Sequence, residues 1–277
     1  MAGKLYLVPT PIGNLGDVSR RARDTLEAVD LIAAEDTRVT VKLLNHLDVK
    51  KPMVSYHRHN CETAGPEILR RLEEGENCAL VTDAGTPAIS DPGEALVALC
   101  AARGVPVEAL PGPCALTVAL SVSGLPTARF TFEGFLPQNK KNRRAVLDGL
   151  AAEERTMVFY EAPHKLCATL EDLEAVFGPE RPMAVCRELT KLHEEVLRLT
   201  IGEARAHFAV QEPRGEFVLV VGGRSPRQEA GDEEAAVARA EALRQEGLPL
   251  KQAAAQAAEE FGVKRRSIYN RIVGKEG

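Results

Sequence analysis

The sequence lacks several patterns that would place it in a familiar class of protein. None of its six cysteines belongs to a C-x-x-C pair, so the spacing of zinc ribbons and thiol redox sites is missing. No apolar stretch is long enough to span a bilayer, and the first residues do not resemble a signal peptide. We therefore expect a soluble cytoplasmic protein with reduced, buried thiols and no membrane partner.

An excess of positive charge is also missing. The 277 residues include 40 acidic and 35 basic side chains, which gives a net charge of −5. This is unlike a protein that holds nucleic acid with its whole surface, but local basic patches can still do so because salt screens charges beyond roughly 8 Å. Hydrophobic residues make up 44% of the chain, enough for about two domains with sizeable cores.

Two absences concern cofactors. The fingerprint G-x-G-x-x-G does not follow the first predicted strand, where residues 13–16 read GNLG, and this argues against a nicotinamide dehydrogenase. His57 and His59 stand close together, but no Cys or carboxylate cluster lies nearby at ligand spacing. We expect no metal site, and expect these histidines to contact RNA or simply to lie at the surface.

The most informative segment that is present is the loop from Asp83 to Gly93, which reads DAGTPAISDPG. It follows an apolar run, 79–82, that predicts a buried strand. Its glycines, prolines and hydroxyl residues provide more turn chemistry than a simple reversal needs. Since open α/β sheets bind small molecules at the carboxyl ends of their strands, the loop is predicted either to hold a ligand or to be a rigid connection.

Strands and helices alternate in the first half of the chain. The hydrophobic pattern predicts strands at 5–8, 31–34, 53–56, 78–81 and 107–110, and helices at 19–29, 37–47, 62–74, 94–102 and 115–122. Such alternation is typical of parallel βαβ units. We expect an N-terminal α/β domain at residues 1–123.

The second half has a different order of elements. Strands are predicted at 131–135, 157–160, 183–186, 195–199 and 217–221, and helices at 144–152, 163–177 and 202–208. The third and fourth of these strands are close enough to form a hairpin. We expect a mixed α/β domain at residues 124–224, then a linker and helical tail at 225–277 with helices at 250–261 and 264–273.

Eight short motifs resemble, in order, those of one enzyme family. They are TPIGNL at 10–15, EDTR at 35–38, DAGTP at 83–87, DPG at 91–93, LPGPCA at 110–115, EGFLP at 133–137, FYE at 159–161 and RELTK at 187–191. Together they are similar to the ribosomal RNA small subunit methyltransferase I family of the tetrapyrrole methylase superfamily. The resemblance runs from about Leu5 to Gly223. It implies two α/β domains of the class III methyltransferase fold, with S-adenosylmethionine bound in the cleft between them, and usually a homodimer.

The resemblance also implies a reaction: methylation of a ribose 2′-oxygen on a decoding-centre cytidine of 16S ribosomal RNA, within the small ribosomal subunit. The sulfonium is a good leaving group, so the displacement needs no metal. Alignment of the reacting atoms is worth an effective molarity of about 10⁵–10⁸ M. A base adds about 10²–10⁴-fold, so the rigid cofactor loops should matter more than any single base.

The cofactor residues follow from the resemblance one by one. Pro9 should border the adenosine, and Cys114 and Ala115 stand where backbone groups at a helix start can hold the methionine carboxylate. For Pro9 and Pro87 the alternative is plain turn geometry, and for Cys114 a small buried thiol. The predicted pocket residues are Pro9, Asp83, Ala84, Gly85, Thr86, Pro87, Ile89, Cys114, Ala115, Tyr160, Phe217 and Val218.

Catalytic groups are specified less tightly. Our hypothesis is that Glu35, Asp36 or Glu188 handles the proton of the 2′-hydroxyl. Asp36 also suits a helix cap. Arg187 and Lys191 are expected to bind RNA phosphates beside Glu188, and the alternative for this group is a surface ion-pair cluster of small energetic value.

Two basic segments are predicted to bind RNA. The first, a mobile loop beside the cleft, would neutralise about four phosphates and make binding fall steeply with salt. The second is a helix-turn-helix-like part of the tail. The alternatives are a solvated loop and a tail that packs within a dimer. The predicted RNA contacts are Arg38, Lys140, Lys141, Arg143, Arg144, Lys264, Arg265 and Arg266.

Three functions from different classes are open at this point. The first is the ribose methyltransferase. The second is a methyltransferase of a small acidic, tetrapyrrole-like molecule, which leaves the basic segments without a role. The third is a non-catalytic RNA-binding assembly factor, against which the intact loop at 83–93 argues.

Overall fold

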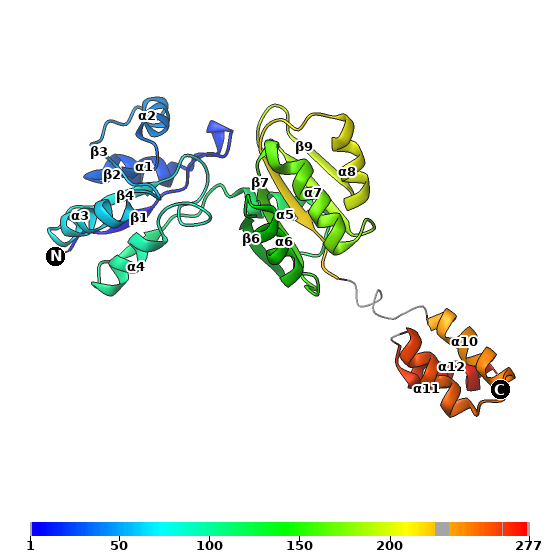
Figure 1. The fold of residues 1–277 in the computed structure, drawn as a ribbon. Helices are drawn as coiled ribbons and strands as arrows, with labels where there is room; N and C mark the ends of the chain where they lie inside the picture. Colours follow the sequence, from blue (N-terminus) through cyan, green and yellow to red (C-terminus); the bar gives the residue numbers. More distant parts are fainter. Residues whose placement is uncertain (1, 225–232, 262, 276–277) are drawn as a thin grey trace.

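The computed structural model describes residues 2–224, 233–261 and 263–275. Figure 1 shows two sheets, each covered by helices, and a separate group of helices at the C-terminal end. Within the described residues, no helix is both long enough and apolar enough to cross a membrane.

The first sheet has five parallel strands in the order β3-β2-β4-β1-β5. These are β1 Leu5–Leu7, β2 Leu31–Ala34, β3 Met53–Ser55, β4 Cys78–Val81 and β5 Val107–Ala109. The intervening helices are α1 Arg20–Ala28, α2 Thr37–His46, α3 Cys61–Glu73, α4 Glu94–Ala102 and α5 Ala115–Val122, with a short 3₁₀ turn, η1, at Leu15–Asp17. Cys78 pairs with Leu5 on one side and Leu31 on the other, so the strand ends that carry the predicted loops meet at one edge.

The central strand β4 shows why this sheet is buried on both faces. Cys78 and Leu80 pack with residues of α3 and α4, whereas Ala79 and Val81 pack with residues of α1 and α2. A strand covered on both faces reads as a continuous apolar run, and that is the pattern of residues 78–81.

The second sheet is mixed, with the order β6-β7-β10-β8-β9. Its strands are β6 Phe130–Phe135, β7 Thr156–Glu161, β8 Pro182–Arg187, β9 Glu195–Thr200 and β10 Phe217–Val221, and its helices are α6 Lys140–Gly149, α7 Pro163–Phe177 and α8 Ile201–Val210. Only β6 and β7 pair in parallel. Helices α6, α7 and α8 cover one face. The other face packs against α5, so α5 joins the two halves of the chain.

The tail forms a small core of its own. Helices α10 Glu233–Gln245, α11 Leu250–Phe261 and α12 Arg265–Lys275 enclose mainly alanines, together with Val237, Leu243, Ile268 and Ile272. Arg239 of α10 pairs with Glu260 of α11 at 2.9 Å. A linker is predicted at 222–232, of which residues 225–232 lie outside the described residues.

Most sequence expectations about elements are confirmed, including the hairpin, which is the antiparallel pair β8–β9. The expectation of a mobile basic loop is wrong, because α6 begins at Lys140 rather than at 144. Asn139 caps it by accepting hydrogen bonds from the N–H groups of Lys141 and Asn142. All six cysteines are free. The expectation of buried thiols is confirmed for Cys78, Cys100 and Cys186, whereas Cys61 and Cys114 are half-buried and Cys167 is exposed.

Candidate active site

A pocket of about 420 Å³ lies where the carboxyl ends of the first sheet face the second sheet. Its first wall comes from the loops that follow β1, β2, β4 and β5. Its second wall comes from the ends of β6, β7, β8 and β10. The lining residues are Ile12, Glu35, 83–86, 89–91, Cys114, Ala115, Phe135, 160–163, Cys186, Leu189 and 216–218.

Ten of the twelve predicted cofactor residues line this pocket: Asp83, Ala84, Gly85, Thr86, Ile89, Cys114, Ala115, Tyr160, Phe217 and Val218. Pro9 and Pro87 do not line it and are buried. Pro9 lies directly under Gly112, where an added Cβ would stand 2.6 Å from the Cβ of Pro9. The two prolines therefore support the backbone of the loops instead of facing the pocket.

The loop after β4 is held in a strained shape. Gly85 has φ +90° and pairs with Thr10 through two backbone hydrogen bonds of 2.9 and 3.1 Å. The Thr86 hydroxyl donates to the carbonyl of Pro113 at 2.9 Å. Ala88 and Ser90 have φ values of +68° and +62°, which are costly for residues with a Cβ. Strain of this kind persists only where surrounding contacts fix the backbone.

An aromatic surface forms the opposite wall. The rings of Phe132 and Phe135 meet that of Tyr160 edge-on, with centroids 4.9 and 5.5 Å apart. The Tyr160 hydroxyl accepts a hydrogen bond of 3.0 Å from the N–H of Leu116 in the first turn of α5. Burial raises the pKa of Tyr160 above its usual value, so this hydroxyl stays protonated.

Three carboxyl groups gather on the wall formed by the first sheet. The Asp36 N–H donates to Asp83 at 3.1 Å, and the Asp83 N–H donates to Glu35 at 3.4 Å. None of Glu35, Asp83 and Asp91 has an ion-pair partner among the described residues. Burial raises the pKa of all three. For Asp91, burial and the charges of Glu35 and Asp83 raise the pKa to about 7.

Of the predicted catalytic residues, only Glu35 lines the pocket. Asp36 caps α2 through the N–H of Arg38 and pairs with the Arg38 guanidinium at 2.6 Å. These hydrogen bonds lower the pKa of Asp36 to about 2. The alternative raised for Asp36, a helix cap, therefore describes its place in the structure, and its charge is too well stabilised for a base.

Arg187, Glu188 and Lys191 lie next to the pocket and not in it. The Lys191 ammonium joins Glu188 at 2.8 Å and Glu216, a lining residue, at 3.0 Å. Burial raises the pKa of Glu188, but the Lys191 hydrogen bond and the Glu216 N–H outweigh it and leave the pKa below its usual value. Arg187 pairs with Glu195 at 3.0 Å.

Lys191 also connects the two halves of the molecule. Its side chain covers Gly13, which has φ +140° and where a Cβ would collide with the Lys191 stem. Gly13 is therefore needed both for its backbone angle and for this close approach.

Sequence reasoning missed several lining residues, among them Ser90, Asp91, Phe135, Glu161 and Glu216. Asp91, Phe135 and Glu161 fall inside the motifs given above, so every residue of those motifs could have been considered as a lining residue. Glu161 is buried and accepts hydrogen bonds from the Thr169 hydroxyl and the Ala162 N–H. Glu216 has no signal in its immediate sequence, because its place depends on the register of β10.

The predicted RNA contacts divide into two groups. Arg38, Lys140, Lys141, Lys264, Arg265 and Arg266 are exposed. Arg143 is buried, and its guanidinium meets Asp172, which is fully buried, at 2.7 Å. Arg144 pairs with the other oxygen of Asp172 at 2.8 Å. The assignment of Arg143 to RNA is therefore wrong, because its charge neutralises a carboxylate inside the protein.

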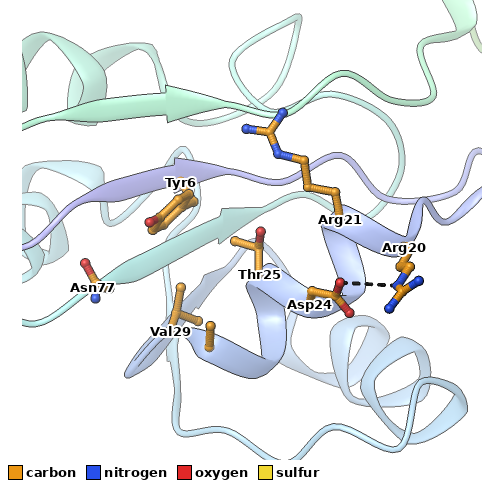
Figure 2. A pocket seen from close by; sticks show the side chains of 8 residues that line it. Tyr6, Arg20, Arg21, Asp24, Thr25, Val29 and Asn77 are labelled. Atoms are coloured by element: carbon orange, nitrogen blue, oxygen red, sulfur yellow. Dashed lines mark ion pairs between the residues drawn. The ribbon is translucent and has the colours of Figure 1, made fainter.

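A second cavity, of about 460 Å³, lies between α1 and the sheet, with Tyr6, Arg20, Asp24 and Asn77 among its lining residues (Figure 2). Arg20 and Asp24 are exposed and face each other at 3.7 Å across one turn of α1. Within residues 2–224, 233–261 and 263–275, no group of three or more His, Cys, Asp or Glu is placed to hold a metal ion.

Solved structures with the same architecture place the fold in a class. The methyltransferase CobJ is 18% identical and matches with a TM-score of 0.61, over 80% of this chain and 95% of its own. Uroporphyrin-III C-methyltransferase from Thermus thermophilus, complexed with S-adenosyl homocysteine, is 19% identical, with a TM-score of 0.55, over 79% and 97%. At these identities the likeness concerns the fold alone, which is the two-domain α/β fold of tetrapyrrole methylases.

Sequence comparisons are more specific. Residues 4–205 match the family model of Tetrapyrrole (Corrin/Porphyrin) Methylases, and residues 229–274 match the RsmI C-terminal HTH domain. Ribosomal RNA small subunit methyltransferase I of Synechocystis is 50% identical over 96% of both chains, and that of Escherichia coli O157:H7 is 48% identical over 99% of this chain and 96% of its own. The chain therefore belongs to the tetrapyrrole methylase family and, within it, to the ribosomal RNA small subunit methyltransferase I family.

Proposed function

We propose that the chain uses S-adenosylmethionine to methylate the ribose 2′-oxygen of a decoding-centre cytidine in 16S ribosomal RNA. The observation that carries the proposal is the charge of the pocket. Five acidic residues line it, Glu35, Asp83, Asp91, Glu161 and Glu216, and none of the described lining residues is basic. Such a pocket suits a cationic cofactor and a neutral hydroxyl, and it keeps phosphate groups outside.

The lining residues fit S-adenosylmethionine. Phe135, Tyr160 and Phe217 offer apolar surface to the adenine ring, and the carboxyl groups suit the sulfonium and ammonium charges. Cys114 and Ala115 bring the first N–H groups of α5 to the pocket, where they can bind the methionine carboxylate. When bound, the cofactor supplies an electrophilic methyl group. The protein aligns the attacking oxygen with that methyl group and excludes water from it.

A pocket carboxylate accepts the proton of the 2′-hydroxyl. A general base works best when its pKa is near the working pH, and Asp91, with a pKa of about 7, meets this condition. Its carboxylate has no hydrogen-bond partner among the described residues, so it is available to a hydroxyl. We therefore assign the base to Asp91. Glu35 stands beside it and helps to keep its pKa high through like charge.

RNA phosphates are held outside the pocket by exposed cations. Lys140 and Lys141 form the first turn of α6, the positive end of the helix dipole, where cations lower helix stability. A phosphate bound there offsets that cost. The half-buried Lys191 contacts the lining residue Glu216, and the exposed Arg38 lies three residues after the lining residue Glu35. The tail adds Lys264, Arg265 and Arg266.

The same geometry disfavours the second candidate, methylation of a small acidic tetrapyrrole. The carboxylates of such a molecule would meet the acidic lining of the pocket at short range, and like charges repel strongly in a partly dry site. The third candidate, an assembly factor without activity, gives no reason for the strained loop at 83–93.

The organisation around the site is part of the proposal. We infer domain boundaries at 1–123, 124–224 and 225–277, which leave each sheet whole. We also propose a homodimer. The names of the relatives mention ribosomal RNA of the small subunit, and we propose that the substrate is this RNA within the assembled small subunit.

The test is to incubate the protein with labelled S-adenosylmethionine and small subunits from a strain lacking this activity, then to locate the label by nuclease digestion and mass spectrometry. We expect label on a cytidine ribose. Label on a base would overturn the 2′-oxygen assignment. Bound cofactor without any transfer, to subunits, free RNA or tetrapyrroles, would favour the assembly factor.

A further inference from the structure

A groove beside the pocket takes no part in the chemistry proposed above. It has a volume of about 250 Å³ and is formed by the loop after β1, the first half of α2 and the residues that follow β4. The motifs at 10–15 and 35–38 flank it, and most of their residues lie outside the pocket itself. Those residues would not contact a ligand that occupies the pocket alone.

The groove and the pocket share one wall. Asp83 lines both. Thr10 and Gly85, which form the backbone bridge between the two loops, line the groove and the pocket respectively. A molecule whose reacting part enters the pocket can therefore place its neighbouring part in the groove.

The groove combines apolar walls with unpaired polar groups. Leu15 and Val39 are 49% and 37% exposed although both are apolar. Thr40 and Thr82 also line the groove and are 3% and 2% exposed, yet neither side-chain hydroxyl has a hydrogen-bond partner among the described residues. Buried hydroxyls nearly always have a partner, and one left without is unfavourable. Two such groups lie beside one groove, where a ligand could provide the missing partners.

We propose that this groove holds one nucleobase of the RNA substrate, with its ring faces against Leu15 and Val39 and its polar edge towards the hydroxyls of Thr40 and Thr82. The inference rests on the proposed function. A base has the required form, a flat apolar ring with hydrogen-bonding groups at its edge, and single-stranded RNA is bound through bases that leave the stack. The exposed Lys42 at the rim is placed for the attached phosphate.

The experiment fills the groove and compares the result with a matched control. Val39→Trp places an indole in the groove. Val41→Trp, two residues along α2, points to the opposite side of the helix and starts from nearly the same exposure, 38%. Binding of small subunits lacking the methyl group is measured by filter retention without cofactor, so the assay does not depend on catalysis.

We expect Val39→Trp to weaken subunit binding about tenfold or more relative to Val41→Trp, the range of one lost base contact. Cofactor affinity and melting temperature should be equal in the two variants. Equal subunit binding would overturn the proposal. Light scattering gives the mass of the protein assembly in solution. A change in this mass for Val39→Trp but not for Val41→Trp would also overturn the proposal, because the groove would then form a contact between protein chains.

A second pair of variants removes only the hydroxyls. Thr40→Val and Thr82→Val keep the shape of the side chain. If these hydroxyls do not contact RNA, the melting temperature should stay the same or rise and RNA binding should not change. We expect unchanged or higher melting temperature with weaker subunit binding, and unchanged binding in both would contradict the assignment. If the wild type binds subunits but transfers no methyl group, the proposed function fails while the groove result stands.

Discussion

The two larger cavities, one beside α1 and one between the two sheets, differ in how their charges are neutralised. In the cavity of Figure 2, Arg20 faces Asp24, and Arg21 binds Glu108 on β5. Its charged side chains thus neutralise one another in solvent, and α1 is a regular helix. In the pocket between the sheets, Glu35, Asp83 and Asp91 form no ion pair with any described residue, and the adjoining loop is strained.

The comparison shows that size alone does not identify a site, since the cavity of Figure 2 is slightly the larger. Exposed ion pairs contribute little free energy and need no ligand. Partly buried carboxylates without partners, held by a backbone with unfavourable φ angles, cost stability that folding alone does not justify. The predictions below test this distinction, from the largest expected effect to the smallest.

Asp91→Asn should have the largest effect. If Asp91 is the base, kcat should fall about 10²–10⁴-fold, with the dissociation constant of S-adenosylmethionine little changed. A base must be deprotonated to act, so wild-type kcat/KM should rise with pH through about 7, and this rise should disappear in the variant. A variant that keeps the rise would transfer the role to Glu35, and Glu35→Gln would then be the variant to test.

The same substitution, Asp91→Asn, should raise stability although it lowers activity. The fold raises the pKa of Asp91, so its charge costs stability above pH 7 and costs nothing well below pH 4, where the group is protonated in both states. The melting temperature of Asp91→Asn should therefore exceed that of the wild type at pH 8, and the two should be similar at pH 3.5. Equal melting temperatures at both pH values would show that Asp91 is not desolvated.

Arg143→Ala and Lys140→Ala separate structure from RNA binding within one helix. Removing Arg143 leaves Asp172 buried beside Arg144 alone, which should lower the free energy of unfolding by about 3 kcal/mol. Burial opposes ionisation of Asp172, but Arg144 and Arg143 lower its pKa. The loss should thus be largest at neutral pH and shrink as pH falls below about 4. Denaturant unfolding at pH 7 and pH 3.5 measures both.

Lys140 is the matched control, because it is exposed in the first turn of the same helix. Lys140→Ala should leave the free energy of unfolding within about 0.5 kcal/mol. Its RNA affinity should fall, and the dependence of that affinity on salt should become shallower. The opposite pattern, a stable Arg143→Ala with weak RNA binding, would restore the sequence-based role of Arg143.

Strands buried on both faces were predictable because their apolar runs are continuous and bounded by turn residues. Residues 31–34, 78–81 and 217–221 begin and end as expected. The start of α6 could not be predicted, because a basic run resembles a loop. Arg143 also interrupts the apolar stripe, which continues one turn later with Leu147. Its partner, Asp172, is distant in sequence, and no local pattern shows such a pair.

The candidate site divides in the same way. The loop residues near Gly85 could be placed from their motif, since glycine and proline chemistry is local. The raised pKa of Asp91 could not be predicted from sequence. Besides burial, it depends on the charges of Glu35, which follows β2, and of Asp83, at the start of the loop after β4, and both come near Asp91 only in the fold. In sequence, Asp36 and Glu188 looked as suitable for the base as Glu35. Their pairings with other side chains, which only the fold shows, lower their pKa values and make them unsuitable.

The smallest effect is expected in the cavity of Figure 2, at Arg20. Its partner Asp24 lies at 3.7 Å, and both side chains are largely exposed, 94% and 58%. Arg20→Ala should therefore change the free energy of unfolding by no more than about 0.5 kcal/mol, and methyl transfer to small subunits less than twofold. Thermal unfolding and steady-state kinetics measure the two quantities. A marked loss of activity would mean that a cavity with neutralised charges can still bind substrate, and the charge criterion that separates the two cavities would fail.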